Sequence, residues 1–197
     1  RDLQWHPFHL CLELIIESVF LQLDFVFFQL IISDTHNFFD EQMKKIIKTC
    51  DEVWHAGDFG YGDQIEFLIN NYTTYGVYGN IDGPEIRKRY PKINKFKCEN
   101  TKILMTHIGG YPKKYRQEIE LAIQSYKPDL YICGHSHILK VIYDKNYNVL
   151  HINPGAAGRE GFHQVRTMIL LKIDGKKIFD LEVIELGKRQ ILSQPIN

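Results

Sequence analysis

The 197-residue chain is long enough for one compact domain with a short remainder, and a domain of this size buries enough apolar surface to need no disulfide staples. Its 24 Lys and Arg residues balance 24 Asp and Glu residues, so it has no overall positive field for gripping nucleic acid or an anionic membrane. Hydrophobic residues (44%) and charged residues (24%) occur at globular frequencies, which excludes a disordered chain and a coiled coil.

The cysteines and the longest apolar run bear on the cellular setting. The four cysteines lie far apart in the sequence and form no Cys-x-x-Cys pair, so we expect neither a disulfide framework nor a thiolate zinc site. This usage favours a cytoplasmic protein. The longest uncharged apolar run, residues 25–33, is far shorter than the roughly 20 residues of a membrane-spanning helix, so we expect no membrane association.

The first 24 residues differ from the rest of the chain. They are apolar, but their spacing fits a helical stripe and a strand alternation equally well. We treat residues 1–24 as an N-terminal extension of unknown role, either a contact for self-association or for a partner, or an artefact of the chosen start. The predicted domain then covers residues 25–187 and is followed by a polar tail, residues 188–197.

Strands and helices alternate from residue 25 onward. Apolar runs predict strands over 25–32, 52–55, 73–78, 101–106 and 130–133. Apolar residues at helical spacing predict helices after Asp40, over 65–72 and over 115–126. After Lys140 the helical period disappears, and strands are expected over 140–143, 148–153, 167–173 and 176–185. This order predicts a mixed α/β protein with more than one sheet.

Residues that can bind a metal open the loop after each of the first five strands. In chain order these loops contain Asp34-Thr35-His36, Gly57-Asp58, Gly79-Asn80-Ile81-Asp82, His107 and Gly134-His135-Ser136-His137. Since the carboxyl ends of parallel strands meet at one edge of a sheet, we expect the five loops to converge although they span about a hundred residues.

Each signal is weak when taken alone. The Gly-Asp and Gly-Asn pairs are common turn dipeptides, and a single His at a strand end is more often structural than ligating. The pair His135 and His137 is stronger, because alternate residues of an extended segment point in opposite directions and a turn is needed for both to face a metal. The occurrence of all five signals at the same topological position is what favours a metal site.

This ordered series resembles the motifs of the calcineurin-like metallophosphoesterase superfamily. The small size, together with Gly79-Asn80-Ile81-Asp82, makes the chain most similar to the small bacterial and archaeal phosphodiesterase branch. The resemblance covers about residues 25–186 and implies a four-layer α-β-β-α sandwich of two mixed sheets. Asn153-Pro154-Gly155 is also similar to a segment that this branch carries near its site, with a plain Pro-Gly turn as the alternative.

The resemblance implies a centre of two divalent metal ions. Asp34, His36 and His137 would hold the first ion, Asn80, His107 and His135 the second, and Asp58 would bridge them, with Asp58, Asn80 and His107 as the catalytic group. Mixed carboxylate, imidazole and amide ligands suit Mn²⁺ best among the expected ions, with Zn²⁺, Fe, Ni²⁺ or Mg²⁺ as alternatives, and suit Ca²⁺ poorly. Such a centre would attract a phosphate locally in a neutral protein.

The implied reaction is hydrolysis of a small-molecule phosphodiester by in-line attack of a hydroxide that bridges the two ions. Many members of the superfamily carry a proton-donating His where this chain has Ile81, so we expect slow cleavage of esters with poor leaving groups. Asp82 is expected to brace the Asn80 loop by hydrogen bonds.

Two other functions and the state of assembly stay open. A non-catalytic interaction scaffold, as in the retromer subunit of the superfamily, would have lost some ligand types, whereas this chain has all seven. A nuclease is disfavoured by the zero net charge. Homo-oligomerisation is left open.

Three further features are expected to be structural: His55 as a packed residue, His163 in a surface loop, and Arg87-Lys88-Arg89 on a solvated helix face.

Overall fold

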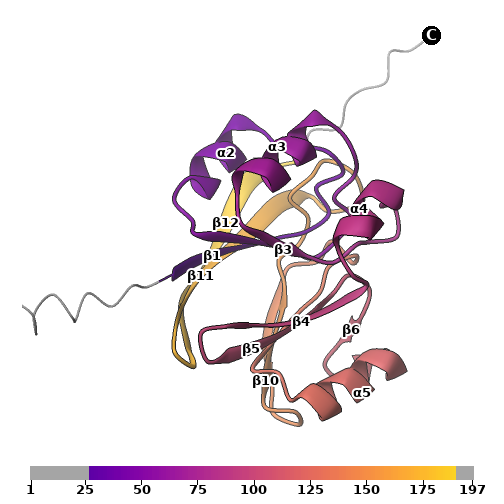
Figure 1. Cartoon of the computed structure of the whole chain (residues 1–197), viewed down its shortest axis with the longest axis vertical. Coiled ribbons are helices and arrows are strands. Elements are labelled where there is room, and N and C mark those ends of the chain that lie inside the picture. The colour runs from indigo at the N-terminus through magenta and orange to yellow at the C-terminus, as the bar shows by residue number, and fades with distance from the viewer. Residues whose placement is uncertain (1–26, 190–197) are drawn as a thin grey trace, which may run out of the picture.

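The computed structural model describes residues 27–189 as four layers: helices, a sheet, a second sheet and a helix (Figure 1). In spatial order, the first sheet contains β12 (Lys177–Lys188), β11 (Val165–Asp174), β1 (Phe27–Ile32), β2 (Glu52–His55) and β3 (Thr74–Gly76). The second contains β4 (Ile93–Cys98), β5 (Thr101–Thr106), β8 (Leu130–Ile132), β10 (Val149–Asn153) and β9 (Lys140–Asp144). The predicted four-layer α/β sandwich is confirmed.

Four helices and a small hairpin complete these layers. The helices are α2 (Glu41–Ile47), α3 (Asp63–Asn71), α4 (Pro84–Arg89) and α5 (Gln117–Tyr126), and the hairpin joins β6 (Gly110–Tyr111) to β7 (Lys114–Tyr115). α2 and α3 cover the outer face of the first sheet, and α5 covers that of the second (Figure 1). Within residues 27–189 no helix is long and apolar enough to cross a bilayer.

The apolar run of β1 is buried on both faces, as its lack of alternation predicts. Leu30 and Ile32 pack with α2 and α3 in one core, while Ile31 faces the second sheet in another. Trp54 of β2 fills the same core between the sheets and is fully buried. A third core lies between α5 and the outer face of the second sheet.

Both sheets are mixed, and this decides where the loops meet. β1 pairs in parallel with β2, and β2 with β3, in the first sheet. β8 pairs in parallel with β5 and with β10 in the second. The loops that carry the predicted ligands all leave the carboxyl ends of these parallel strands.

The sequence patterns missed β4 and the hairpin, whereas the helix face expected at Arg87-Lys88-Arg89 belongs to α4. β4 alternates polar and apolar residues and lies at the edge of its sheet, so it has no continuous apolar run to reveal it. The expectation that Tyr115 begins the third helix is wrong. Tyr115 pairs with Gly110 in the hairpin and donates a hydrogen bond to Asp144 at 3.0 Å, so α5 begins at Gln117.

The predicted ends of the domain stay predictions. β12 continues to Lys188, and the whole of the extension 1–24 lies outside the described residues, as do residues 190–197.

The buried His151 of β10 makes stability pH-dependent. Burial, assisted by the charge of Lys140 and opposed by Asp144, lowers the pKa of His151 from 6.5 to about 4. The unfolded chain therefore binds more protons than the folded one as pH falls from 6.5 towards 4, and folding stability is lost over that window.

Replacing this histidine with phenylalanine should remove that loss, because phenylalanine is also a planar ring but has no titratable group. Within residues 27–189 the change breaks no hydrogen bond at His151 Nδ1. We expect the free energy of unfolding of His151→Phe, relative to the parent, to rise by about 2 kcal/mol between pH 7 and pH 5. Urea unfolding at both pH values measures this. The other histidines are common to both proteins and cancel, so parallel pH curves would contradict the prediction.

Candidate metal centre

Two clusters of ligand-type side chains lie at the carboxyl edge of the parallel strands. In the first, the ligand atoms of Asp34, His36 and His137 lie within 4.8 Å of one another. In the second, those of Asp58, His107 and His135 do the same. The structure also places Asn80 here, since its Oδ1 lies 3.1 Å from His107 Nε2. All seven residues singled out from the sequence therefore come together, from five separate loops.

Two carboxylates lie between the clusters. Asp58 Oδ2 is 3.2 Å from His107 Nε2 in its own cluster and 3.9 Å from His36 Nε2 in the other. Asp34 Oδ1 is 3.0 Å from His137 Nε2 and 3.9 Å from His107 Nε2. The clusters are thus adjacent, and both carboxylates face histidines of both clusters.

The backbone at these residues is unusual. Asp34, His36, Asp58, His135 and His137 all have left-handed φ angles, from 48° to 67°. This conformation is rare outside glycine and costs about 1–3 kcal/mol for each residue. It solves the problem that the spacing of the two loop histidines posed: with left-handed turns at His135 and His137, both side chains reach the same centre.

Hydrogen bonds between the loops hold this backbone in place. The N–H groups of Asp34 and His36 donate to the carbonyls of Gly57 and Asp58, at 2.9 and 3.1 Å. The N–H of His135 donates to Asp34 Oδ2 at 3.2 Å, across a sequence separation of 101 residues. No loop therefore adopts its conformation alone.

Close packing makes two glycines necessary. A Cβ on Gly57, which has a φ of +94°, would lie 2.6 Å from His107 Nδ1. A Cβ on Gly79 would lie 2.0 Å from Asp58 Oδ1. The Gly-Asp and Gly-Asn pairs are thus more than turn signals, because any side chain at either glycine would displace a ligand-type residue.

Unpartnered buried atoms test whether the cluster fits metal ions. Asp34 is fully buried, and within the described residues 27–189 neither its Oδ1 nor His36 Nε2 has a hydrogen-bond partner. Although Asp34 Oδ1 lies 3.0 Å from His137 Nε2, the two atoms form no hydrogen bond, as expected of lone pairs aimed at a common point rather than at each other. A buried carboxylate oxygen without a donor is costly unless a cation neutralises it, so these residues fit divalent ions.

Hydrogen bonds at the far ring nitrogens fix the tautomer of two histidines. His107 Nδ1 lies 2.8 Å from the Ala56 carbonyl, which can only accept. His163 Nε2 likewise lies 3.1 Å from the Gly158 carbonyl, so in the neutral ring its Nδ1 accepts from His137 Nδ1 at 3.2 Å. Burial lowers the pKa of His163, which favours this neutral form. In the neutral His137 ring that donates through Nδ1, Nε2 has the lone pair that a ligand needs.

The charges in the cluster are coupled. Burial opposes the charged form of both Asp58 and His107, but their mutual hydrogen bond outweighs it: the pKa of Asp58 is lowered and that of His107 is raised. Each group therefore favours the charged form of the other, and a divalent ion would take the place of the imidazole proton.

Comparison with known proteins agrees with this geometry. Residues 29–176 match the family model described as "Calcineurin-like phosphoesterase superfamily domain". The chain belongs to the calcineurin-like phosphoesterase superfamily. No curated protein matches the sequence.

Solved structures share the superfamily fold. Vps29 from Chaetomium thermophilum has a TM-score of 0.64 at 15% identity, covering 82% of this chain and 99% of that one. Vps29 from Entamoeba histolytica, crystallised with Zn²⁺, gives 0.62 at 18% identity, with 80% and 98% covered. A structure described as a novel archaeal phosphodiesterase gives 0.59 at 24% identity, with 81% and 99% covered.

Other residues support the superfamily motifs as the sequence analysis expected. Asp82 is buried and accepts hydrogen bonds from the N–H groups of Gly60 and Gly79, at 2.9 and 2.7 Å, so it braces the Asn80 loop. His55 is a packed residue: it is buried, and its ring stacks on Phe59 with 3.6 Å between centroids.

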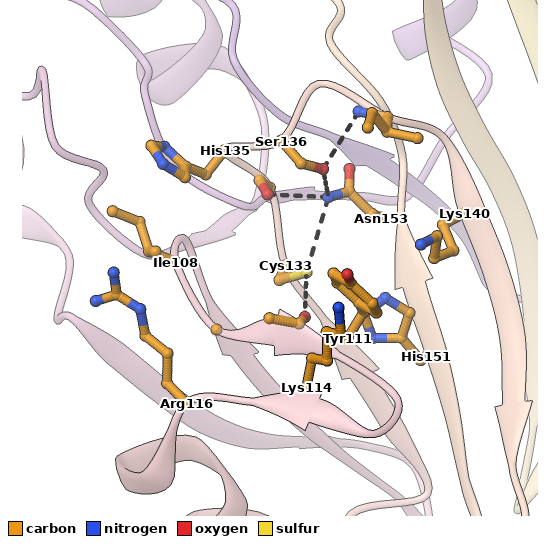
Figure 2. A pocket seen from close by; sticks show the side chains of 14 residues that line it. Ile108, Tyr111, Lys114, Arg116, Cys133, His135, Ser136, Lys140, His151 and Asn153 are labelled. Carbon is orange, nitrogen blue, oxygen red and sulfur yellow. Dashed lines mark hydrogen bonds between the residues drawn. The ribbon is translucent and has the colours of Figure 1, made fainter.

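The segment at Asn153 lies near the site rather than forming only a turn. Asn153 Nδ2 donates to the Gly134 carbonyl at 2.9 Å and to Ser136 Oγ at 3.0 Å (Figure 2). Asn153 thereby holds the loop that carries His135 and His137.

Two expectations need correction. His163 is not simply a surface-loop residue, because it contacts His137 and is only partly exposed. The Arg87 side chain, although on an exposed stretch of α4, also donates hydrogen bonds to the carbonyls of Gly79, Asn80 and Asp82. Neither contact has a local sequence signal. His163 lies in an irregular loop, 26 residues after the His137 that it contacts.

Removing the imidazole of His163 should weaken metal binding. In His163→Phe no acceptor faces His137 Nδ1, so the tautomer of His137 is no longer fixed, and we expect a roughly 10–100-fold loss of affinity. Calorimetric titration of the metal-free protein with Mn²⁺ measures it. Gln164→Ala, at the exposed neighbouring position, is the control. Equal affinities for His163→Phe and the parent would show that the contact has no role.

Proposed function

We propose that this member of the superfamily is a metal-dependent phosphodiesterase that acts on a small molecule. The observation that carries the proposal is the convergence of seven ligand-type side chains with unpartnered buried atoms among them. Asp34, His36 and His137 would hold one divalent ion, and Asn80, His107 and His135 the other. Asp58 would bridge the two.

When bound, two ions of this kind supply Lewis acidity toward phosphate oxygens and a hydroxide nucleophile at neutral pH. Mn²⁺ is the ion we propose, because the set combines carboxylate and amide oxygens with imidazoles and contains no thiolate. The protein's part is to hold the ligands. The strained backbone, the two fixed tautomers and the bracing by Asp82 all keep them in place before substrate arrives.

The surroundings of the second cluster support a diester as substrate. A cavity of about 230 Å³ is lined by Asn80, His107, Arg87 and Arg116. A second cavity of about 280 Å³ is lined by His135 and, again, by Arg116. A diester carries two ester groups on one phosphate, and the two cavities flanking the cluster offer a place for each.

A protein-interaction scaffold on the same fold is the competing hypothesis. Because the Vps29 structures and the archaeal phosphodiesterase share this fold at low identity, fold likeness does not separate the two functions. The complete ligand set favours catalysis. Turnover of bis-p-nitrophenyl phosphate with added Mn²⁺, compared with a metal-free control, distinguishes the hypotheses, and no turnover above the control would favour the scaffold.

Neutralising the bridging carboxylate should remove metal and activity together. Asp58→Asn keeps the shape but loses the charge that faces both clusters. We therefore expect metal content per chain to fall and diesterase activity to drop by more than the roughly 10–100-fold typical of losing a supporting residue. Elemental analysis and the diester assay measure the two effects. Asp174→Asn, on an exposed residue at the end of β11, is the matched control. Full activity in Asp58→Asn would sink the proposal.

A proton donor at position 81 should widen the range of leaving groups. Ile81 is 47% exposed, and its contribution to the site is its backbone N–H, which donates to Asp58 Oδ1 at 3.0 Å. Ile81→His keeps that bond and adds a general acid, an effect worth typically about 10²–10⁴-fold when well placed. We expect faster release of methanol from methyl p-nitrophenyl phosphate, with little change in p-nitrophenol release. Ile81→Gln, which cannot donate a proton of suitable pKa, should behave as the parent.

A further inference from the structure

The larger of the two cavities has a distinctive lining, and we call it the basic pocket. Its walls are the β6–β7 hairpin on one side and the loop from Gly134 to Lys140 on the other (Figure 2). Its volume is about 280 Å³, close to the lower end of small-molecule sites. His135 stands at its edge, so the pocket opens directly beside the candidate metal centre (Figure 2).

Three cations line the basic pocket: Lys114, Arg116 and Lys140. No carboxylate is among the lining residues, and within residues 27–189 none of the three cations forms an ion pair. The carboxylates nearest in sequence are engaged elsewhere, since Asp144 accepts from Tyr115 and Glu118 pairs with Lys92 at 2.7 Å. In a chain of zero net charge, this is a local excess of positive charge.

One of these cations is positioned by a neighbouring aromatic ring. Lys140 Nζ lies 4.1 Å from the centroid of the Tyr111 ring, which holds the ammonium over the pocket by a cation–π contact. His151 also lines the pocket but is only 1% exposed, and among residues 27–189 its Nδ1 has no hydrogen-bond partner.

From this arrangement we infer that the basic pocket binds one ester group of the substrate, and that this group carries a phosphate monoester of its own. The inference rests on the proposed phosphodiesterase function. A phosphate monoester has a charge of about −1.5 to −2 and three acceptor oxygens, which suits three cations better than a single carboxylate does. Arg116 adds the planar fork that binds phosphate through two parallel hydrogen bonds.

A pair of chromogenic diesters tests the inference. Thymidine 5′-(4-nitrophenyl phosphate) and its 3′-phosphorylated counterpart have the same scissile bond and leaving group and differ only in the second phosphate. We expect kcat/KM to be roughly 10–100-fold higher for the phosphorylated ester, the range for hydrogen bonds to charged groups. The double variant Lys114→Met/Lys140→Met should bring this ratio towards one. Lys145→Met, which removes an exposed charge in the turn after β9, should leave it unchanged.

The outcomes separate the two proposals. If the parent cleaves both esters equally well, or if Lys145→Met lowers the ratio as much as the double variant does, the pocket assignment is overturned while the phosphodiesterase activity stands. If neither ester is cleaved in the presence of Mn²⁺, the proposed function fails.

A binding measurement tests the pocket assignment without relying on catalysis. Calorimetry of the metal-free protein compares thymidine 3′,5′-bisphosphate with thymidine 5′-monophosphate. Tighter binding of the bisphosphate that the double variant loses supports the pocket, and equal binding of the two nucleotides overturns it.

Discussion

The hydrogen bonds between the loops at the carboxyl edge are the constraint on which the site depends. Asp34 and Asp58 lie in loops that pair with each other through backbone bonds, and the loop of His135 is tied to the carboxylate of Asp34. These bonds compensate for five residues in left-handed conformations, which no single loop would maintain. The strain is thus spread over the two sheets that anchor the loops, and the ligand-type atoms are held together before any ion or substrate binds.

The same constraint explains why the cluster of ligand-type residues favours the binding of cations. Bringing Asp34 and Asp58 into a buried region leaves negative charge that the neighbouring histidines only partly neutralise. Asp58 is paired with His107, whereas Asp34 Oδ1 accepts no hydrogen bond from the part of the chain that the structure describes. Burial of an uncompensated carboxylate costs several kcal/mol, so the fold tolerates it where the binding of a divalent ion repays the cost.

Much of the architecture could be predicted because local sequence patterns indicate its strands and helices. The unbroken apolar run of β1 and the helical spacing at Met43 and Ile47 follow from burial alone. The seven ligand-type residues could be found because each begins a loop after a predicted strand, and parallel strands share an edge. The edge strand β4 and the start of α5 could not, because β4 alternates and Tyr115 is held by Asp144 and Tyr131 from distant strands.

The contacts that complete the site were equally hidden from the sequence. The role of His163 depends on a carbonyl, Gly158, that lies five residues before it and on a ring 26 residues before it. The segment Arg87-Lys88-Arg89 has the composition of a solvated helix face. The hydrogen bonds of Arg87 to three loop carbonyls exist only because α4 begins directly after the Asn80 loop. Such contacts arise from tertiary placement, and a period or a motif carries no information about them.

The sheets and the loops of this fold have separate roles. The two sheets and their three cores account for the likeness to both Vps29 and the archaeal phosphodiesterase, and they contain none of the seven ligand-type residues. A loop can exchange one side chain for another without disturbing the cores, as Ile81 illustrates: its N–H bonds to Asp58, but its side chain is half exposed and bound to no core. The chemistry of this protein therefore depends on its loop residues, and the basic lining beside His135 is where we propose that the substrate is selected.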